Sequence, residues 1–366
     1  MTAKPTPLYQ THIKYGGRMV EFGGWLLPVQ YTGIKEEHYA VRKRAGLFDV
    51  SHMGEVAVQG PDALRFLQHL VTNNVGKLVN QQVLYTPMCY LDGGTVDDLL
   101  VYKKEDNKYL LVINAANIEK DCRWIKENAI GFDVICENIS DQVAQLALQG
   151  PLAETILARL TTAPLAELNY YWFWPEIEVA GKKVLLSRTG YTGEAGFELY
   201  CQPEEAASLW DDIMTSGAED GILPTGLGCR DTLRFEAGLP LYGHELSEVI
   251  SPIEAGLGIF VKFDKGDFNG RQSLYKAKSE GPARKIVGFE MVERGVARAE
   301  YPVLLEGRRI GVVTTGSYAP SLDKNLGLAL IEAEYANVGQ QVDIQVRGKN
   351  VAAQIISKPF YRREGK

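Results

Sequence analysis

The chain has 366 residues, of which 45% are hydrophobic and 10% aromatic, and it carries a formal net charge of −7. This length allows two or three domains with a sizeable core, and the composition excludes an intrinsically disordered chain. Because Lys and Arg are scattered, no basic stripe is available for phosphate backbones, and nucleic acid is not an expected partner.

The sequence also argues against membrane insertion and secretion. No apolar run approaches the roughly 18 residues that a membrane span needs. The first seven residues lack the charged-then-apolar profile of a secretion signal. The five cysteines form no CxxC pair, and the five histidines show no HxH or HxxxH spacing. We therefore expect a cytoplasmic protein with reduced, mostly buried cysteines, no membrane partner and no metal.

The N-terminal segment, residues 1–46, mixes aromatic residues and glycine turns with a helix near Glu36–Arg44, and we expect it to pack on the core. An internal repeat follows. The sequence VAVQGPDALRFLQHL (56–70) matches LALQGPLAETILARL (146–160). Each copy predicts a short strand, a Gln-Gly-Pro turn and a helix with proline in its first turn.

The segments that follow the two copies also correspond. After the first copy we predict strands near 83–90, 96–103 and 109–114 and a helix over 117–128. After the second copy we predict strands near 171–180, 183–188 and 197–201 and a helix over 203–216. Both halves follow the order β-α-β-β-β-α. The sequence therefore predicts two related α+β units, residues 47–139 and 140–280, with a groove for a ligand between them.

The segment DGGTVDDLLVY (92–102) combines a glycine turn with a predicted strand. Because side chains alternate along a strand, Asp98 shares a face with Val96 and Leu100, while Asp97 lies on the opposite face. At least one of these carboxylates must lie on a mostly apolar face, where it needs hydrogen bonds or a cation. The alternative is that both flank a hairpin turn and stay in water.

A second glycine-rich stretch is SRTGYTGEAGFELY (187–200). Its glycines recur every three residues, which is too widely spaced for a phosphate loop, and we interpret them as allowing a flat ligand to approach the backbone. Glu198 lies on a predicted buried strand, where a planar heterocycle with an amino group and a ring N–H would offer it two hydrogen bonds. The alternative for Glu198 is the exposed face of an edge strand.

The last third of the chain has a different pattern. A helix is predicted near Leu227–Ala237, and Arg230 on its apolar side is either a surface residue or a buried anchor for an anion. The charged segment 276–284 is interpreted as a linker. Short alternating runs after it predict an antiparallel barrel, so residues 281–366 are expected to form a C-terminal β-barrel domain.

Several motifs together resemble the aminomethyltransferase family, the T-protein of the glycine cleavage system. The match covers essentially the whole chain, and the motifs are FDVSHMGE (48–55), DGGTVDDLLVY, RTGYTGEAGFE, GLGCRDTLRFEAGLPLYGHE and KPFY. The resemblance implies an α+β, cloverleaf-like fold that binds tetrahydrofolate as a co-substrate. It also implies transfer of the aminomethyl carbon from the lipoyl arm of the H-protein to tetrahydrofolate, giving 5,10-methylenetetrahydrofolate and ammonia.

The resemblance assigns roles residue by residue. The catalytic aspartate of the family falls on Asp98. The folate-contacting residues fall on Tyr85, Asn114, Tyr191, Glu198 and Arg230. Two positions depart from the family pattern: Cys229 stands where the family usually has alanine, and Phe360 where some relatives have tyrosine. The first departure is a small packing change, and the second would remove one hydroxyl contact.

Other relatives of this fold bind folate without this reaction. Iron–sulfur assembly factors carry a KGCYxGQE-like segment, whereas this chain has RTGYTGEAGFE. The dimethylglycine and sarcosine oxidising enzymes need an extra nucleotide-binding domain, and this chain is expected to begin directly at the folate-binding part. The alternative function is therefore a folate-binding carrier or assembly factor of the same fold, which would bind tetrahydrofolate without lipoyl-dependent activity.

Overall fold

The computed structural model describes residues 3–363 and divides into two compact units. Unit 1 comprises the residues up to Phe66, Val75–Leu84 and Leu99–Leu233, and unit 2 comprises the remainder. Strands β6 (Val83–Cys89) and β7 (Thr95–Glu105) each begin in one unit and end in the other. Across residues 3–363, no helix has both the length and the apolar character needed to span a membrane.

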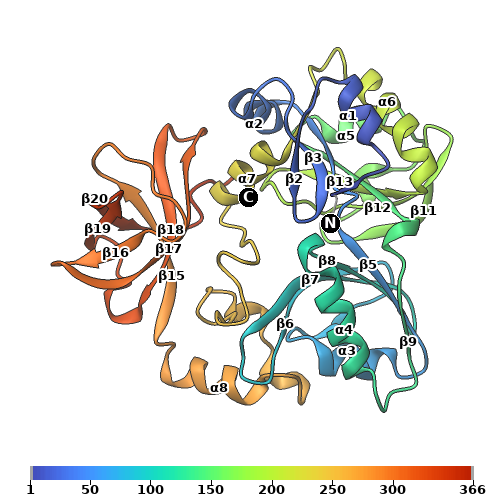
Figure 1. Cartoon of the computed structure of the whole chain (residues 1–366). Helices are drawn as coiled ribbons and strands as arrows, with labels where there is room; N and C mark the ends of the chain where they lie inside the picture. The colour runs from blue at the N-terminus through green and yellow to red at the C-terminus, as the bar shows by residue number, and fades with distance from the viewer. Residues whose placement is uncertain (1–2, 364–366) are drawn as a thin grey trace. The chain divides into compact units, whose positions relative to one another are not determined.

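Two sheets organise unit 1 (Figure 1). The first has the order β11-β12-β13-β10-β4-β14, formed by β4 (Gly46–Asp49), β10 (Ala144–Gln149), β11 (Phe173–Val179), β12 (Lys182–Ser187), β13 (Gly196–Cys201) and β14 (Leu223–Pro224). The second has the order β6-β7-β8-β5-β9, with β5 (Gly54–Gln59), β8 (Lys108–Ile113) and β9 (Ile135–Asn138) beside β6 and β7. Each sheet thus contains one copy of the internal repeat.

The predicted order of elements is confirmed in both copies. The first copy continues through α3 (Ala63–Leu70) and α4 (Ile118–Asn128), and the second through α5 (Ala153–Leu157) and α6 (Ala206–Ser216). The prediction that proline occupies the first helical turn was wrong, because both helices begin two residues after it. The prolines instead follow Gly60 and Gly150, whose φ angles are positive and which let the chain reverse tightly.

The two sheets of unit 1 share one buried layer of side chains. Tyr102 of β7 lies opposite Leu110 of β8, and Tyr200 of β13 lies opposite Leu185 of β12. One cluster combines residues of both sheets: Val83, Tyr102, Leu110, Val112, Phe173, Leu185 and Tyr200. At this level the two halves form a packed core rather than the predicted groove, because aromatic rings fill the space between the sheets.

The N-terminal segment contains more regular structure than its turns suggested. Strands β1 (Lys4–Pro5), β2 (Arg18–Phe22) and β3 (Trp25–Gln30) form a small sheet, and α1 (Tyr9–Lys14) and α2 (Ile34–Lys43) accompany it. Buried hydrogen bonds anchor it to β4. His12 Nε2 lies 2.8 Å from Asp49 Oδ2, and Thr6 Oγ1 donates to the same oxygen at 2.7 Å. These contacts replace water around a fully buried carboxylate.

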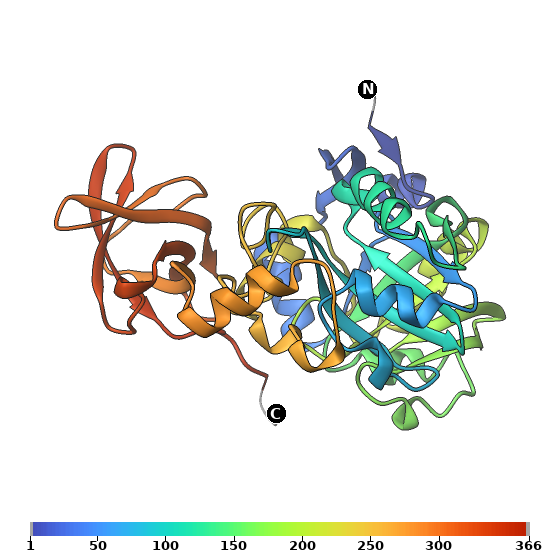
Figure 2. The ribbon, with the colours of Figure 1, turned by 90° about the horizontal axis from the view of Figure 1, so that it is seen from below.

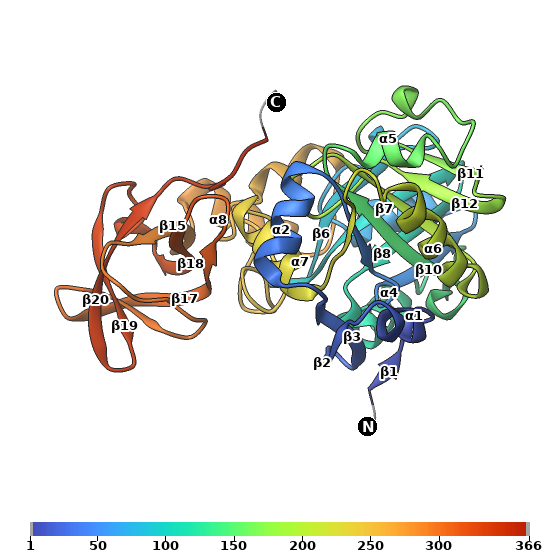
Figure 3. The same ribbon diagram turned by 90° about the horizontal axis from the view of Figure 1, so that it is seen from above.

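Helix α2 and the first part of α7 (Leu227–Glu236) lie side by side in unit 1 (Figure 3), and α7 from Arg234 onward belongs to unit 2. The buried carboxylate of Glu37 on α2 organises the start of both helices. Its Oε1 accepts hydrogen bonds from the backbone N–H groups of residues 31, 32 and 33, and its Oε2 accepts one from Gly226 N at 2.9 Å. These donors lie before the first turns of helices, where N–H groups have no helical partner.

Unit 2 contains the predicted antiparallel barrel, which is confirmed (Figure 2). The barrel closes in the order β15-β18-β17-β16-β19-β20, with strands β15 (Arg284–Met291), β16 (Pro302–Leu305), β17 (Arg308–Ala319), β18 (Lys324–Glu332), β19 (Gln341–Val346) and β20 (Lys349–Ile356). The linker predicted over 276–284 was wrong for its first part, because α8 (Arg271–Glu280) continues to residue 280. Its charges belong to the exposed side of a helix whose Leu274 is buried.

The structure makes Glu37 a strong candidate for a stability test. We expect Glu37→Ala to lower the free energy of unfolding by about 3 kcal/mol, because it leaves several backbone N–H groups without their acceptor. Urea denaturation followed by circular dichroism measures this change. Glu36→Ala is the matched control, since Glu36 is exposed on the same helix turn. Equal stability of the two variants would contradict the role of Glu37.

Glu55 of β5 provides a test based on pH. The residue is 1% exposed, and neither carboxyl oxygen has a hydrogen-bond partner within residues 3–363. Burial therefore raises the pKa of Glu55 well above its usual range. Above about pH 4.5, Glu55 releases its proton in the unfolded chain but keeps it in the folded chain. The free energy of unfolding therefore falls by up to about 1.4 kcal/mol per pH unit, until the pH reaches the pKa of Glu55 in the folded protein.

We expect Glu55→Gln to remove this slope, because an amide does not ionise. Urea unfolding at about pH 5, 6 and 7 measures the difference in slope between variant and parent, which isolates Glu55 from other acids. Glu137→Gln, at an exposed position of the neighbouring strand β9, should leave the slope unchanged. Parallel pH curves for parent and Glu55→Gln would show that Glu55 does not carry this penalty.

Candidate functional site

Two of the predicted residues, Tyr85 and Asp98, meet in unit 2. Tyr85 Oη donates a hydrogen bond to Asp98 Oδ2 at 2.9 Å. The Tyr85 ring also packs edge-on against Phe260, with 4.8 Å between the ring centroids. Asp97 is completely buried and Asp98 is half-buried, so the alternative in which both aspartates stay in water is wrong. Asp98 therefore has a fixed hydrogen-bond donor while part of it remains accessible.

The DGG turn before β7 has a structural role. Asp92 Oδ1 accepts a hydrogen bond from Gly94 N at 3.0 Å, and Gly93 has a φ of +93°. A Cβ at Gly94 would overlap the carbonyl oxygen of Glu248, so only glycine fits there. The turn therefore connects β6 and β7 tightly and sets the start of the strand that carries Asp98.

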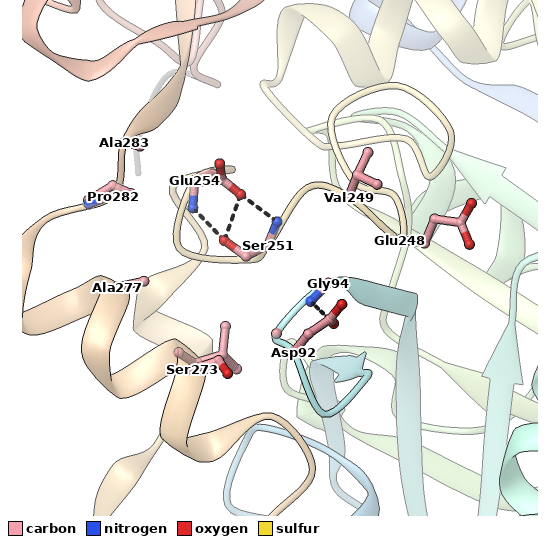
Figure 4. Close-up of a pocket in the computed structure, with 12 residues that line it drawn as sticks. Asp92, Gly94, Glu248, Val249, Ser251, Glu254, Ser273, Ala277, Pro282 and Ala283 are labelled. Atoms are coloured by element: carbon pink, nitrogen blue, oxygen red, sulfur yellow. Dashed lines mark hydrogen bonds between the residues drawn. The ribbon is translucent and has the colours of Figure 1, made fainter.

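A cavity of about 320 Å³ lies beside this turn in unit 2 (Figure 4). Acidic residues Asp92, Glu248 and Glu254 contribute to its lining. Glu254 accepts hydrogen bonds from Ser251, as Figure 4 shows. Its Oε1 also forms an ion pair with Arg284 Nε at 2.8 Å. Much of its charge is therefore compensated within the protein.

Glu198 lies in unit 1 on β13, between β12 and β10 in the centre of the first sheet. Its side chain is 7% exposed, so the alternative of an exposed edge position is wrong. Thr189 Oγ1 donates a hydrogen bond to its Oε2. Burial raises the pKa of Glu198, while the Thr189 hydroxyl and the positive charge of Arg230 act in the opposite direction. The carboxylate is thus buried and only partly compensated.

Arg230 and Tyr191 form a pair in the same unit. The guanidinium carbon of Arg230 lies 4.6 Å from the centroid of the Tyr191 ring, a cation–π contact. Arg230 is half-buried, between the surface residue and the buried anion anchor that the sequence left open. Burial, and then the charge of Arg230, lower the pKa of the buried His52 to about 4. Arg230 therefore faces a neutral imidazole and places positive charge near Glu198.

The loop that carries Tyr191, residues 188–195 between β12 and β13, is held by Gln149 of β10. We call it the Tyr191 loop. Gln149 Nε2 donates to the carbonyl oxygen of Thr189 at 3.2 Å, and Thr192 Oγ1 donates to Gln149 Oε1 at 2.9 Å. A Cβ at Gly190 or Gly196 would overlap the Gln149 side chain. Our interpretation of these two glycines as room for a ligand was therefore wrong, because they make room for Gln149.

Arg42 of α2 provides a second support that the sequence analysis missed. Its Nη1 donates to the carbonyl oxygen of Thr192 at 2.7 Å and lies 3.0 Å from Glu194 Oε1 in a buried ion pair. Its Nη2 donates to the carbonyl oxygen of Leu233 on α7 at 3.3 Å. One guanidinium thus ties the Tyr191 loop to the helix that carries Arg230. The sequence contains no local signal for this, because the partners lie more than a hundred residues away.

The remaining predicted positions are less closely connected. Asn114 follows β8 in unit 1 and is half-buried, and its carbonyl oxygen accepts a hydrogen bond from Asn117 N at 3.0 Å. Cys229 is buried in an apolar cluster with Leu233. Phe360 packs against Phe235, with 5.2 Å between ring centroids. Within residues 3–363, His, Cys, Asp and Glu side chains form no group of three or more suited to a metal ion.

The structure therefore brings the predicted residues together in two groups, one in each unit. Tyr85 and Asp98 are bonded in unit 2, and Tyr191, Arg230 and Glu198 are linked in unit 1. The group in unit 2 can provide a carboxylate for proton transfer, and the group in unit 1 can provide an acceptor for planar N–H groups and a positive charge for an anion.

Comparison with known proteins identifies the family. Residues 8–265 match the GCVT N-terminal domain, and residues 284–362 match the glycine cleavage T-protein C-terminal barrel domain. Aminomethyltransferases from a Geobacillus species and from Halalkalibacterium halodurans are 56% and 55% identical to this chain. These alignments cover 98% of this chain and 99% and 98% of the relatives, respectively.

A solved structure agrees with these relatives. The crystal structure of glycine cleavage system aminomethyltransferase T from Bartonella henselae is 33% identical in sequence, covers 98% of both chains and superposes with a TM-score of 0.91. An identity above 50% over almost the full length, together with the same fold, shows membership of the family as well as a shared architecture. The chain belongs to the aminomethyltransferase family, the T-protein family of the glycine cleavage system.

Proposed function

We propose that this chain transfers the aminomethyl carbon carried by a lipoylated H-protein to tetrahydrofolate. The carbon–sulfur bond to the lipoyl arm breaks, the carbon bridges two folate nitrogens, and ammonia leaves. The two protons lost by the folate nitrogens pass to the lipoyl sulfur and to the departing amine. The products are 5,10-methylenetetrahydrofolate, ammonia and the reduced lipoyl arm. The family match over nearly the whole chain supports this reaction.

Asp98 is the proposed catalytic residue. A folate nitrogen must lose its proton as it attacks carbon, and a carboxylate within reach accepts that proton and stabilises developing positive charge. The observation that carries this assignment is the hydrogen bond of 2.9 Å from Tyr85 Oη to Asp98 Oδ2. This hydrogen bond orients the carboxylate, and the half-buried position of Asp98 keeps it accessible to a substrate.

The other residues are proposed to bind tetrahydrofolate. Glu198 accepts hydrogen bonds from the amino group and ring N–H of the pterin, which is consistent with its buried and undercompensated carboxylate. Tyr85 and Tyr191 pack against the ring system, and Asn114 contributes a polar contact. Arg230, whose guanidinium already stacks on Tyr191, supplies positive charge for the folate carboxylates.

The proposal includes the cellular context. The partners are lipoylated H-protein and tetrahydrofolate, the latter as co-substrate, and no metal, nucleic acid or membrane takes part. We also propose a cytoplasmic location, which the free cysteines at positions 89, 122, 136, 201 and 229 support because reduced thiols are typical of that compartment. We propose four parts of the chain: an N-terminal segment (residues 1–46), a first α+β unit (47–139), a second α+β unit (140–280) and a C-terminal barrel domain (281–366).

The first test is Asp98→Asn in an assay with lipoylated H-protein. We expect turnover to fall by about 10²–10⁴, because the amide cannot accept the proton. The dissociation constant for tetrahydrofolate, measured by titration calorimetry, should change much less. Asp106→Asn, on an exposed turn, is the control and should leave turnover unchanged.

The same assay separates the enzyme from a folate carrier. Normal turnover of Asp98→Asn would remove Asp98 from the mechanism. Saturable binding of tetrahydrofolate by the parent, without any lipoyl-dependent turnover, would instead favour a carrier or assembly factor. Strong loss of binding in Glu198→Ala, with the parent active, would support the proposed role of Glu198.

A further inference from the structure

A continuous line of buried hydrogen bonds ends at Glu198 in the core of unit 1. Its members, in order, are Gln145, Tyr200, Tyr102, Ser187, Thr189 and Glu198. It starts at Gln145 Nε2, which donates to Tyr200 Oη at 3.0 Å, and Tyr200 Oη lies 2.9 Å from Tyr102 Oη. Tyr102 Oη donates to Ser187 Oγ at 3.2 Å, and Ser187 Oγ lies 2.9 Å from Thr189 Oγ1. Tyr102 Oη also lies 3.4 Å from Thr189 Oγ1. Thr189 Oγ1 finally donates to Glu198 Oε2. All these side chains are less than 10% exposed.

The two ends of this line fix the direction of every hydrogen bond in it. The side-chain N–H₂ of Gln145 can only donate, and an ionised carboxylate can only accept. Each hydroxyl between them has one hydrogen, so each must donate to the next residue toward Glu198 and accept from the one before. Donors aligned in one direction polarise one another, which strengthens the last bond to the carboxylate.

The structure thus gives the two oxygens of Glu198 different tasks. Oε2 receives the end of the line, whereas Oε1 accepts no hydrogen bond from any residue within 3–363. We propose that Tyr102 and Tyr200 are positioning residues that orient Glu198 through Ser187 and Thr189, so that Oε1 is presented to the pterin of tetrahydrofolate. This inference rests on the proposed function of Glu198 as the pterin acceptor.

The groups around Glu198 are consistent with this role. Arg230 from α7 is the cation that favours the ionised form. Three phenols face the carboxylate of Glu198: Tyr102 on β7, Tyr171 before β11 and Tyr200 on β13. Burial raises the pKa of each phenol, and the negative charge of Glu198 raises it further. These phenols therefore stay protonated at neutral pH and act as hydrogen-bond donors.

The test removes one hydroxyl from the middle of the line. Tyr102→Phe keeps the ring, which packs against Phe173 with 5.1 Å between centroids, but breaks the connection between Tyr200 and Ser187. We expect tetrahydrofolate binding to weaken about tenfold, as for loss of a hydrogen bond that supports a charged group. Tyr109→Phe is the matched control, because Tyr109 is 3% exposed and lies outside the line.

Two further readouts separate positioning from general stability. The pKa of Glu198, measured by nuclear magnetic resonance with ¹³C-labelled glutamate in the ligand-free protein, should rise in Tyr102→Phe and stay unchanged in Tyr109→Phe. The preference for tetrahydrofolate over an analogue without the 2-amino group should decrease in Tyr102→Phe. A folded variant with an unchanged Glu198 pKa and unchanged preference would overturn the proposal. Thr189→Val breaks the same line at its last hydrogen bond, to Glu198 Oε2, if Tyr102→Phe does not fold.

A double-mutant cycle with Glu198→Gln distinguishes failure of this inference from failure of the proposed function. If Tyr102 acts through Glu198, the effects of the two substitutions on folate affinity will not add. Additive losses would contradict the positioning role and leave Glu198 as a folate contact. If Glu198→Gln alone leaves affinity unchanged, the proposed role of Glu198 fails, and the proposal built on it fails with it.

Discussion

The buried carboxylate of Glu198 is the constraint on which much of unit 1 depends. A carboxylate in the centre of a sheet is costly unless donors surround it, and the surrounding hydroxyls supply one bond while Arg230 supplies charge. The protein leaves this compensation incomplete. A group that is kept buried but incompletely bonded is poised to gain from a ligand with N–H donors, and this is a reason to place recognition there.

The position of Tyr191 depends on a second set of buried contacts. Gln149 fills the space above two glycines, and Arg42 bonds to both the loop and α7. Because each of these side chains bonds to more than one segment, the loop cannot shift without breaking several hydrogen bonds at once. The cation–π pair of Tyr191 and Arg230 is therefore held from both sides by residues that need not touch a ligand.

Local pattern in the sequence was sufficient for the elements of the repeat and the barrel strands, because alternation and turn residues act within a few positions. It left the burial of Glu198 open, because a buried strand and the exposed face of an edge strand share the same local alternation. It was not sufficient for the glycines of the Tyr191 loop. These positions need glycine because a Cβ there would overlap the side chain of Gln149, which lies some forty residues earlier in the chain. No local sequence rule connects residues so far apart. The same limit explains why Arg42 was missed and why the charged end of α8 was interpreted as a linker. Charge on a helix surface and charge in a linker are alike in sequence.

The two copies of the repeat show how one motif acquired different roles. Both contain Gln-Gly-Pro after a strand, and in both the glycine has a positive φ. Gln59 of the first copy is exposed, whereas Gln149 of the second is 1% exposed and holds the Tyr191 loop. The shared motif is therefore explained by the turn that both halves need to begin a helix. Its glutamine became a support for the candidate site only where glycines on the neighbouring strand and loop left room for it, so the repeat accounts for the fold and the departures from it account for the site.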